Sequence, residues 1–275
     1  MILVGDVFDR LCDIEPQSIQ AVITSPPYYR LRDYEVEGQL GQEATVEEYV
    51  ENLATVGDML APLLTPTGTY WLNIGDSYGD KGMRLAPHRL AIEMQSRGWF
   101  VHCDVVWRKT RYMPNGGKSR PVLIHEYVFM FSRQRSGHYY NPDAIREPHS
   151  PVSLKRWKAS GVAALGAPHS MGHKQADGGY KTKTVVANPL GKLKASVWDI
   201  CPSNYPGAHF AVMPEKLAET CLLASTQPGD RVFDPFAGSG TTGVVAKRHH
   251  RLFTGIELDP DAAALAITRI EETIK

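Results

Sequence analysis

The sequence predicts an α/β fold in which a doubly wound, mostly parallel sheet carries helices on both faces. Short apolar runs alternate with longer helix-like segments along most of the 275 residues, which is typical of strands joined by crossover helices. One apolar run near the carboxyl end continues through a glycine-rich turn into a helix, an arrangement that binds nucleotides. The length suits one large domain with an insertion.

The first half of the chain supplies most of the strands. Thr45 precedes Glu48 by three residues, as in a capping box, so a helix is expected to begin there. A second helix is expected to stop at Gly98. The elements predicted for this half are strands at 2–4, 20–24, 68–74, 100–107 and 122–132 and helices at 44–63 and 86–97.

The second half contains a long break in this pattern. Residues 141–197 are rich in Gly, Ser, Pro, Lys and His and show weak periodicity, which predicts an insertion. Order returns with a helix at 214–227, a strand at 231–234, a helix at 241–250, a strand at 252–257, and a last helix capped by Asp259 with Pro260 behind it. We therefore expect residues 1–140 and 201–275 to form two halves of one domain around an insertion at 141–200.

A stiff loop follows the apolar run at residues 21–24. Ser25-Pro26-Pro27-Tyr28 stops the strand, because proline fixes its own φ and restricts the residue before it. A hydroxyl, a backbone carbonyl and an aromatic ring are thereby held at fixed separations. Two acceptors beside a ring suit a planar heterocycle that carries an exocyclic amine.

A second motif, a glycine-rich loop near the carboxyl end, indicates what the proline loop could act on. Residues 238–243 match G-x-G-x-x-G between a strand and a helix, and Glu257 follows about twenty residues later, where an acid binds a ribose in nucleotide-binding folds. Because the carboxyl ends of parallel strands meet at one edge of a sheet, the loops after residues 24 and 234 are expected to lie side by side.

Found in this order, the motifs resemble the S-adenosylmethionine-dependent DNA amino-methyltransferases. More narrowly, the chain is similar to their permuted beta group, in which the catalytic loop comes first, then the target-recognition region, then the cofactor loop. The resemblance rests on Gly5-Asp6, 24–28, 68–78, 107–109, Arg120-Pro121, 125–127, His209-Phe210, Pro214, 234–242 and Glu257.

The resemblance implies direct transfer of a methyl group from S-adenosylmethionine to the exocyclic amine of a base flipped out of double-stranded DNA. It implies a catalytic loop of Ser25, Pro26, Pro27 and Tyr28, in which the Ser25 hydroxyl and the Pro26 carbonyl accept from the amine and Tyr28 stacks on the base. The implied cofactor residues are Asp6, Phe210, Pro214, Asp234, Phe236, Gly238, Gly240, Thr241, Thr242 and Glu257. The segments then become a catalytic half (1–140), a target-recognition insertion (141–200) and a cofactor-binding half (201–275).

The charge distribution supports a polyanionic partner. Residues 108–200 contain 16 Lys and Arg against 5 Asp and Glu, a net of +11, whereas the rest of the chain has 14 against 25, a net of −11. Such asymmetry is typical of a nucleic-acid-binding region on an acidic body, although a solvated basic loop would show it as well. The candidate DNA contacts are Arg108, Lys109, Arg111, Lys118, Arg120, Lys155, Arg156 and Lys158.

Other features narrow the class of protein. The four cysteines are scattered without a C-x-x-C pair, so neither a metal site nor a disulfide framework is expected. No apolar stretch reaches the length of a membrane span, and no basic segment precedes the short N-terminal apolar run. We expect a cytoplasmic protein of prokaryotic or phage origin.

Several functions remain open from the sequence. Cytosine-N4 is favoured as the target, because the family pattern associates Ser at position 25 with cytosine-N4 and Asp with adenine-N6. Adenine-N6 is the next alternative, followed by methylation of RNA or a protein amide, for which Asn is more usual at this position. An NAD-dependent oxidoreductase shares G-x-G-x-x-G, and a DNA-binding protein without catalysis is a further alternative. A homodimer and a cognate restriction endonuclease are candidate partners.

Overall fold

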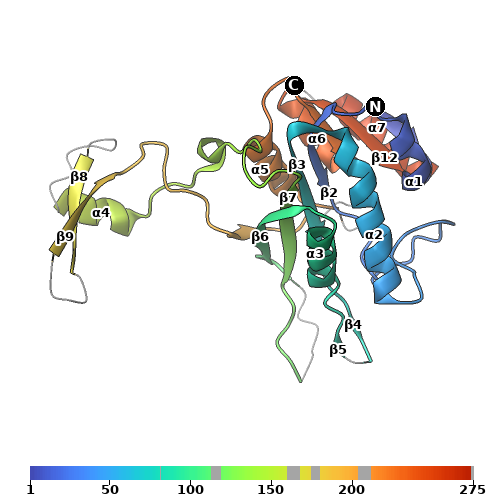
Figure 1. Ribbon diagram of the computed structural model, residues 1–275, viewed down its shortest axis with the longest axis horizontal. Coiled ribbons are helices and arrows are strands. Elements are labelled where there is room, and N and C mark those ends of the chain that lie inside the picture. Colours follow the sequence, from blue (N-terminus) through green and yellow to red (C-terminus); the bar gives the residue numbers. More distant parts are fainter. Residues whose placement is uncertain (81, 113–118, 160–167, 175–179, 204–211, 274–275) are drawn as a thin grey trace. The chain divides into compact units, whose positions relative to one another are not determined.

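A computed structural model of the chain describes residues 1–80, 82–112, 119–159, 168–174, 180–203 and 212–273 (Figure 1). The chain forms two compact units: Met1–Tyr140 together with Ser196–Lys275, and Asn141–Ala195. The last residues of the segment 141–200 belong to the first unit, because Val197–Ile200 pairs with a strand of its sheet.

The first unit is built on one eight-stranded sheet with the order β1-β12-β11-β2-β3-β7-β6-β10. All pairs from β1 to β3 are parallel, β7 runs antiparallel to both β3 and β6, and β10 is parallel to β6. The predicted mostly parallel sheet is thereby confirmed. The strands are β1 (Ile2–Val4), β2 (Ile19–Thr24), β3 (Leu64–Ile74), β6 (Phe100–Lys109), β7 (His125–Ser132), β10 (Val197–Ile200), β11 (Arg231–Asp234) and β12 (Leu252–Glu257).

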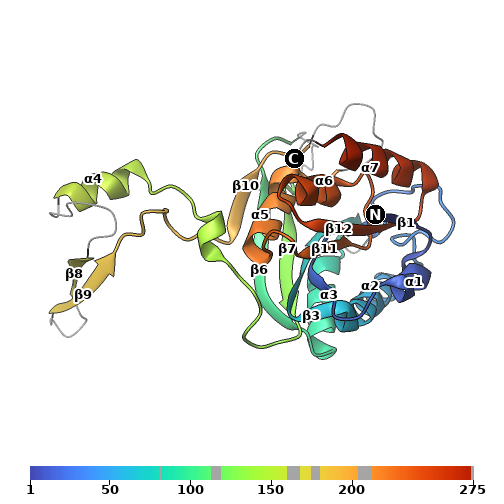
Figure 2. The same ribbon diagram turned by 90° about the horizontal axis from the view of Figure 1, so that it is seen from above.

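Helices cover both faces of this sheet. Figure 2 shows α1, α2 and α3 on one side and α5, α6 and α7 on the other. Their bounds are α1 (Val7–Arg10), α2 (Val46–Leu60), α3 (Ala86–Ser96), α5 (Glu215–Ser225), α6 (Thr241–Arg248) and α7 (Pro260–Glu272). Among the described residues, no helix is both long and apolar enough to cross a membrane.

Local sequence explains where the longer helices begin. Thr45 accepts from the Glu48 N–H while the Glu48 side chain accepts from the Thr45 N–H, so the predicted capping box is present at α2. Asp259 caps α7 by accepting from the Asp261 N–H. The short elements α1, β4 (Tyr78–Gly79) and β5 (Gly82–Met83) were not predicted, because two to four residues carry too little periodicity.

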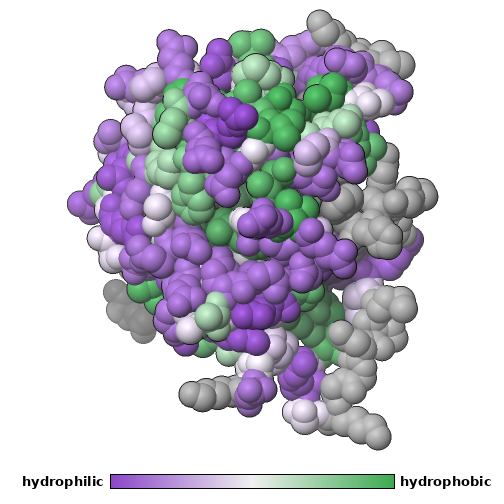
Figure 3. Space-filling view, turned by 90° about the vertical axis from the view of Figure 1, so that its right-hand side faces the viewer, coloured by the Kyte–Doolittle hydropathy of each residue, from purple (hydrophilic) through white to green (hydrophobic). Residues whose placement is uncertain are grey.

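The core lies between the sheet and its helices. All six residues of β2 are buried, as expected for a central parallel strand with helices on both faces. The largest fully buried side chains include Trp99, Tyr49, Phe131 and Phe233. Hydrophilic side chains cover much of the face seen in Figure 3, and hydrophobic ones gather in patches between them.

The second unit forms regular elements despite its weak periodicity. It contains a short 3-10 helix (Pro142–Ile145), α4 (Pro151–Ala159) and a hairpin of β8 (Pro168–Lys174) and β9 (Tyr180–Val186). Near its two ends, Glu147 and Lys192 form an isolated antiparallel bridge, and the Glu147 carboxylate pairs with Lys192 and Lys194 at 2.9 and 3.0 Å. Gly191 fits this bridge because an added Cβ would lie 2.2 Å from the Glu147 carbonyl oxygen.

Candidate active site

One cavity lies at the carboxyl ends of four neighbouring parallel strands. Strand β2 pairs directly with β11, with Ala21 opposite Val232, so Ser25 and Gly238 line the same cavity. Asp6, after β1, and Glu257, at the end of β12, line it as well. The predicted meeting of the proline loop and the glycine loop is therefore confirmed, and it follows from the strand order alone.

Hydrogen bonds from α2 and from a following loop fix the proline loop. The Tyr49 hydroxyl donates to the Pro27 carbonyl at 2.7 Å, and the Arg30 N–H donates to the Gly41 carbonyl at 2.8 Å. Gly41 has a φ of +94°, and an added Cβ would lie 3.0 Å from the Tyr28 carbonyl oxygen. These contacts hold the backbone of the loop against α2 and the loop that contains Gly41.

Four side chains, which we call the Ser25 cluster, meet beside the cavity: Ser25, Tyr28, Asn73 and Glu126. The Tyr28 hydroxyl donates to Glu126 Oε2 at 2.5 Å and lies 3.1 Å from Ser25 Oγ. Asn73 Nδ2 donates to the Tyr28 hydroxyl at 2.7 Å, to Glu126 Oε2 at 3.0 Å and, more weakly, to Ser25 Oγ at 3.3 Å. On the outer side, Lys109 Nζ pairs with Glu126 Oε1 at 2.6 Å.

The backbone at Gly75 fixes the position of the Tyr28 ring, as the hydrogen bonds fix its hydroxyl. An added Cβ on Gly75 would lie 2.8 Å from Tyr28 Cε2, so this glycine lets the ring lie directly on the backbone. Burial raises the pKa of the Tyr28 hydroxyl well above its usual range, and the nearby Glu126 carboxylate raises it further. Tyr28 is therefore neutral at physiological pH.

Sequence reasoning missed Asn73 and Glu126 as members of the site, although both lie in segments that carried the family resemblance. One signal was available: Asn73 interrupts the apolar run Trp71-Leu72-Asn73-Ile74, and it is buried in β3. A buried polar side chain in a central strand needs partners, which points to other polar groups nearby.

A buried carboxylate joins the two loops beneath the cavity. Asp234 accepts from Thr24 Oγ1 at 2.5 Å, from Thr242 Oγ1 at 2.8 Å and from the Phe236 N–H at 3.1 Å. Burial is the largest influence on this group and raises its pKa to about 6, even though the three hydrogen bonds favour the charged form.

The three glycines of the motif have different roles. The Gly238 N–H donates to Glu257 Oε2 at 2.6 Å, which couples the glycine loop to the end of β12. Gly240 has a φ of +80°, and an added Cβ would lie 2.9 Å from Ala266 Cβ, so it packs α6 against α7 and does not line the cavity. Gly243 similarly brings α6 close to Phe253 of β12.

The cavity suits a polar ligand that carries a positive charge. The carboxylates of Asp6, Glu257 and Asp259 line it, and burial raises the pKa of Glu257. Thr241 Oγ1 is buried at the cavity wall and has no hydrogen-bond partner within the described part of the chain. The acids can bind ribose hydroxyls or face a sulfonium, and the buried hydroxyl is open to a ligand. These groups fit S-adenosylmethionine.

The other predicted cofactor residues are placed as follows. Phe236 and Thr242 line the cavity. Pro214 is buried at the N-cap of α5 and does not line it, although the preceding Met213 does. Phe210 lies outside the described residues. The loop after the proline loop also contributes, through Tyr34 and its neighbours, which sequence reasoning missed.

The predicted DNA-contact residues differ in what they contact in the structure. Arg108 makes two hydrogen bonds to Asp199 of β10, at 2.6 and 2.5 Å, and Lys109 pairs with Glu126, so acids already neutralise both cations. Arg111 is exposed, and Arg120 lies 3.4 Å from the centre of the Tyr78 ring. Lys155 and Arg156 are exposed on α4; Lys118 and the Lys158 side chain lie outside the described residues.

Comparisons with known proteins agree with this geometry. Residues 19–268 match the family described as DNA methylase, of the N6/N4 type. The Type II methyltransferase M.Cfr9I of Citrobacter freundii is 32% identical over 296 residues, which cover 97% of this chain and 86% of that protein.

Two solved structures are similar in fold. The PvuII DNA methyltransferase, described as cytosine-N4-specific, has a TM-score of 0.71 at 22% identity and matches 100% of this chain and 87% of that one. The M1.HpyAVI complex with S-adenosylmethionine has a TM-score of 0.59 at 21% identity and matches 98% of each chain. The family match also excludes the NAD-dependent oxidoreductase. The chain belongs to the DNA methylase family: it is a DNA amino-methyltransferase that uses S-adenosylmethionine.

Proposed function

We propose that the protein methylates N4 of a cytosine flipped out of duplex DNA. The observation that carries this proposal is that Ser25 Oγ and the glycine loop line one cavity. A methyl donor bound against Gly238 and Glu257 would then face an amine held at Ser25. When bound, the cofactor supplies the methyl group as a carbon activated by a positively charged sulfur.

The proline loop would bind the target amine. The amine lone pair is delocalised into the base, so acceptors on its two hydrogens favour tetrahedral nitrogen and stabilise the charge that develops on it. Ser25 Oγ is one such acceptor. The Pro26 carbonyl is the other, and it accepts no hydrogen bond from the residues that the structure describes. The Tyr28 ring, backed by Gly75, would stack on the base.

Two features support base flipping into this site. The amine of a paired base lies inside the duplex, out of reach of a loop set at the edge of a sheet. Contacts with Tyr49 and Gly41 also hold the loop backbone in place, which favours movement of the nucleotide toward the loop. For the target base, the family pattern of Ser at position 25 favours cytosine, and adenine-N6 is the second candidate.

Contacts to DNA would come from basic residues that are exposed in the described part of the chain. Arg111 and Arg120 of the first unit and Lys155 and Arg156 on α4 are the described candidates for phosphate contacts. Sequence reading would be the task of the Asn141–Ala195 unit. A homodimer, a cognate restriction endonuclease and a cytoplasmic location in a prokaryotic or phage-infected cell complete the proposal.

The test identifies the methylated base directly. DNA from a host without its own methyltransferases is incubated with the protein and S-adenosylmethionine, digested to nucleosides and analysed by mass spectrometry. N4-methylcytosine is expected; N6-methyladenine alone would overturn the choice of base and leave the amino-methyltransferase assignment in place. Single-molecule sequencing of the same DNA locates the target site, and size-exclusion chromatography with light scattering reports the oligomeric state.

A further inference from the structure

We infer that Tyr28 and Glu126 form a relay that removes the proton which the target amine loses on methylation. The inference rests on the proposed function, and it gives a role to the Tyr28 hydroxyl and the Glu126 carboxylate, which stacking and amine binding do not use. Tyr28 is a catalytic residue in this scheme because it also contacts the base, whereas Glu126 is a positioning residue that acts through Tyr28.

The directions of the hydrogen bonds define the relay. An ionised Glu126 can only accept, so the single proton of the Tyr28 hydroxyl points to Glu126 Oε2 at 2.5 Å. The contact between Tyr28 and Ser25, at 3.1 Å, must then use the Ser25 proton. Ser25 Oγ is left with lone pairs for the target amine. The hydroxyl that receives the amine proton is thus already connected to a carboxylate.

Asn73 and Lys109 fix the end of the relay. Asn73 Nδ2 donates to Glu126 Oε2 and to the Tyr28 hydroxyl, and Lys109 Nζ pairs with Glu126 Oε1. Both contacts use the Glu126 oxygens as acceptors. The Glu126 side chain is 11% exposed, against 30% for Lys109, so the carboxylate is nearly buried while its partner reaches toward solvent. The proton that Glu126 gains would therefore leave to water at this partly open edge, beside Lys109.

The chemistry balances without a further reactant. The amine nitrogen bonds to the methyl carbon while the carbon–sulfur bond breaks, its electron pair staying on sulfur, and the positive charge moves to nitrogen. The nitrogen then loses one proton to Ser25 Oγ, the Ser25 proton moves to the Tyr28 oxygen, and the Tyr28 proton moves to Glu126. Ser25 and Tyr28 end as they began, and Glu126 carries one additional proton.

The energetics agree with this direction of transfer. A methylated aromatic amine that still carries its additional proton is a strong acid, so an ordinary carboxylate is a sufficient final acceptor. Burial and the Glu126 charge hold the pKa of Tyr28 far above its usual range, so Tyr28 passes a proton without remaining ionised.

A purely structural role for Glu126 predicts different experimental results from a relay. If Glu126 only held the Tyr28 ring in place, its loss would disturb entry of the base and DNA binding. A relay instead predicts a slower chemical step with normal binding. Tyr28→Phe keeps the ring and removes the relay hydroxyl, and Glu126→Gln keeps the shape and the hydrogen-bond acceptor but cannot take the proton.

The experiment compares these variants and their double variant with the wild type. The control is Tyr127→Phe, which removes a neighbouring phenol whose described contacts, to His125, His88 and Phe129, lie outside the relay. The readouts are the single-turnover rate on an oligonucleotide with the located site, cofactor affinity by calorimetry, and fluorescence of pyrrolocytosine at the target position, which reports flipping.

Each relay variant is expected to lose roughly 100-fold in single-turnover rate, the usual order for proton transfer by a positioned group. The double variant should be no slower than the slower single variant, because the relay acts as a unit. Cofactor affinity and pyrrolocytosine fluorescence should match the wild type, as should every readout of Tyr127→Phe. The inference is overturned if either relay variant keeps a rate within threefold of wild type, or loses fluorescence together with rate. Absence of methylation by the wild type would instead count against the proposed function.

Discussion

Thr24 of β2 donates a hydrogen bond to the buried Asp234 of β11, 210 residues away in the sequence. This bond joins the strand that leads to the proline loop with the strand that leads to the glycine loop. Thr242, at the start of α6, donates to the second oxygen of the same carboxylate. The loop that would bind the base and the loop that would bind the methyl donor are thus anchored to one side chain.

The buried Asp234 carboxyl should make the free energy of unfolding depend on pH. Burial raises the pKa of Asp234 to about 6, above the ~3.9 of an unfolded chain. The folded state therefore holds this proton more tightly, and the group's contribution to the free energy of unfolding is full below about pH 4 and is lost as the pH rises through about 6. Asp234→Asn, neutral at every pH, should remove this dependence, which amounts to about 3 kcal/mol.

Urea unfolding of wild type and Asp234→Asn between pH 4 and 7.5 measures the effect, with the exposed Asp9→Asn as control. The free-energy difference between wild type and Asp234→Asn should change across this range, in favour of Asn at higher pH. A constant difference would show that Asp234 has the same proton affinity in both states.

Ser25→Ala should separate chemistry from cofactor binding. The substitution removes one acceptor for the amine and leaves Gly238, Glu257 and Asp6 in place, so the single-turnover rate should fall by roughly 100- to 1,000-fold. Cofactor affinity, measured by calorimetry, should stay within about threefold, since only one lining hydroxyl changes. An equal loss of cofactor affinity would assign Ser25 a structural role.

Gly75→Ala tests the contact behind the Tyr28 ring. The new Cβ would lie 2.8 Å from Tyr28 Cε2 and 3.0 Å from Cδ2, so the ring must move. We expect a loss of about 1–3 kcal/mol in the free energy of unfolding, as for other overpacked sites, and a lower pyrrolocytosine signal because the base loses its platform. Normal flipping with normal stability would mean that the ring has room to move.

Salt titrations of DNA binding can distinguish exposed basic residues that contact phosphates from basic residues that pair with an acid of the protein. Each phosphate contact adds roughly 0.9 to the slope of log affinity against log salt. Arg111→Gln should therefore lower the slope by roughly that amount. The double variant Arg108→Gln with Asp199→Asn removes a matched ion pair and should leave the slope almost unchanged. The reverse order of effects would place Arg108 on the phosphates and Asp199 away from the DNA.

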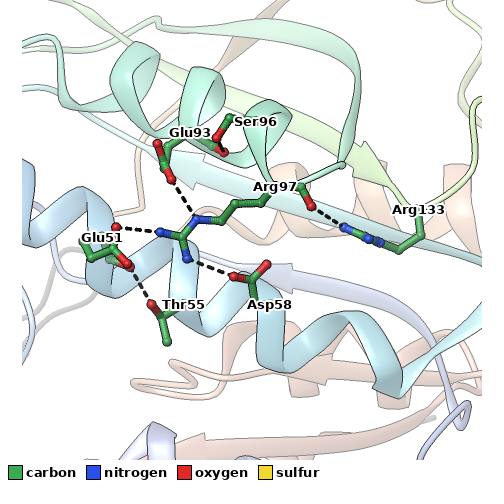
Figure 4. A network of polar contacts seen from close by, with 7 residues as sticks. All are labelled: Glu51, Thr55, Asp58, Glu93, Ser96, Arg97 and Arg133. Carbon is green, nitrogen blue, oxygen red and sulfur yellow. Dashed lines mark hydrogen bonds and ion pairs between the residues drawn. The ribbon is translucent and has the colours of Figure 1, made fainter.

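Arg97 holds α2 and α3 together, as Figure 4 shows. Its guanidinium binds Glu51 and Asp58 of α2 and Glu93 of α3 at 2.6–2.9 Å, and its side chain is 18% exposed. Because the acids are partly exposed, Arg97→Met should cost only about 1–2 kcal/mol of unfolding free energy. Arg89→Met breaks the more exposed pair with Glu47 and should cost less than about 0.5 kcal/mol. Equal losses in chemical denaturation would show that the network adds nothing to a single pair.

The main sheet and its two ligand-facing loops could be predicted from sequence, because they depend on local patterns. Apolar periodicity located the strands of the sheet outside the insertion, and the order of the motifs along the chain indicated the permuted arrangement. The Ser25 cluster could not be predicted in this way. Asn73 and Glu126 reach Tyr28 only because β7 pairs with β3 in the register that sets Asn73 opposite Val128.

The same limit applies to the basic residues. Arg108 and Lys109 appear in the sequence as free cations, but the strands on either side of β6 place Asp199 and Glu126 beside them. Charge counts report composition and not pairing, and pairing depends on the register between strands. The elements of the second unit could not be predicted for another reason: its helix and the two strands of its hairpin are short and rich in polar residues.

The bridge between Glu147 and Lys192 has a consequence for how such enzymes diversify. The bridge pairs the two ends of the second unit before the chain continues into β10. Residues 148–191 therefore form a long loop whose two ends are held together. Lengthening or replacing that stretch changes only a closure entropy that grows with the logarithm of its length. If the Asn141–Ala195 unit reads the DNA sequence, as proposed above, exchange of this one segment would change the sequence that is read and leave the catalytic fold unchanged.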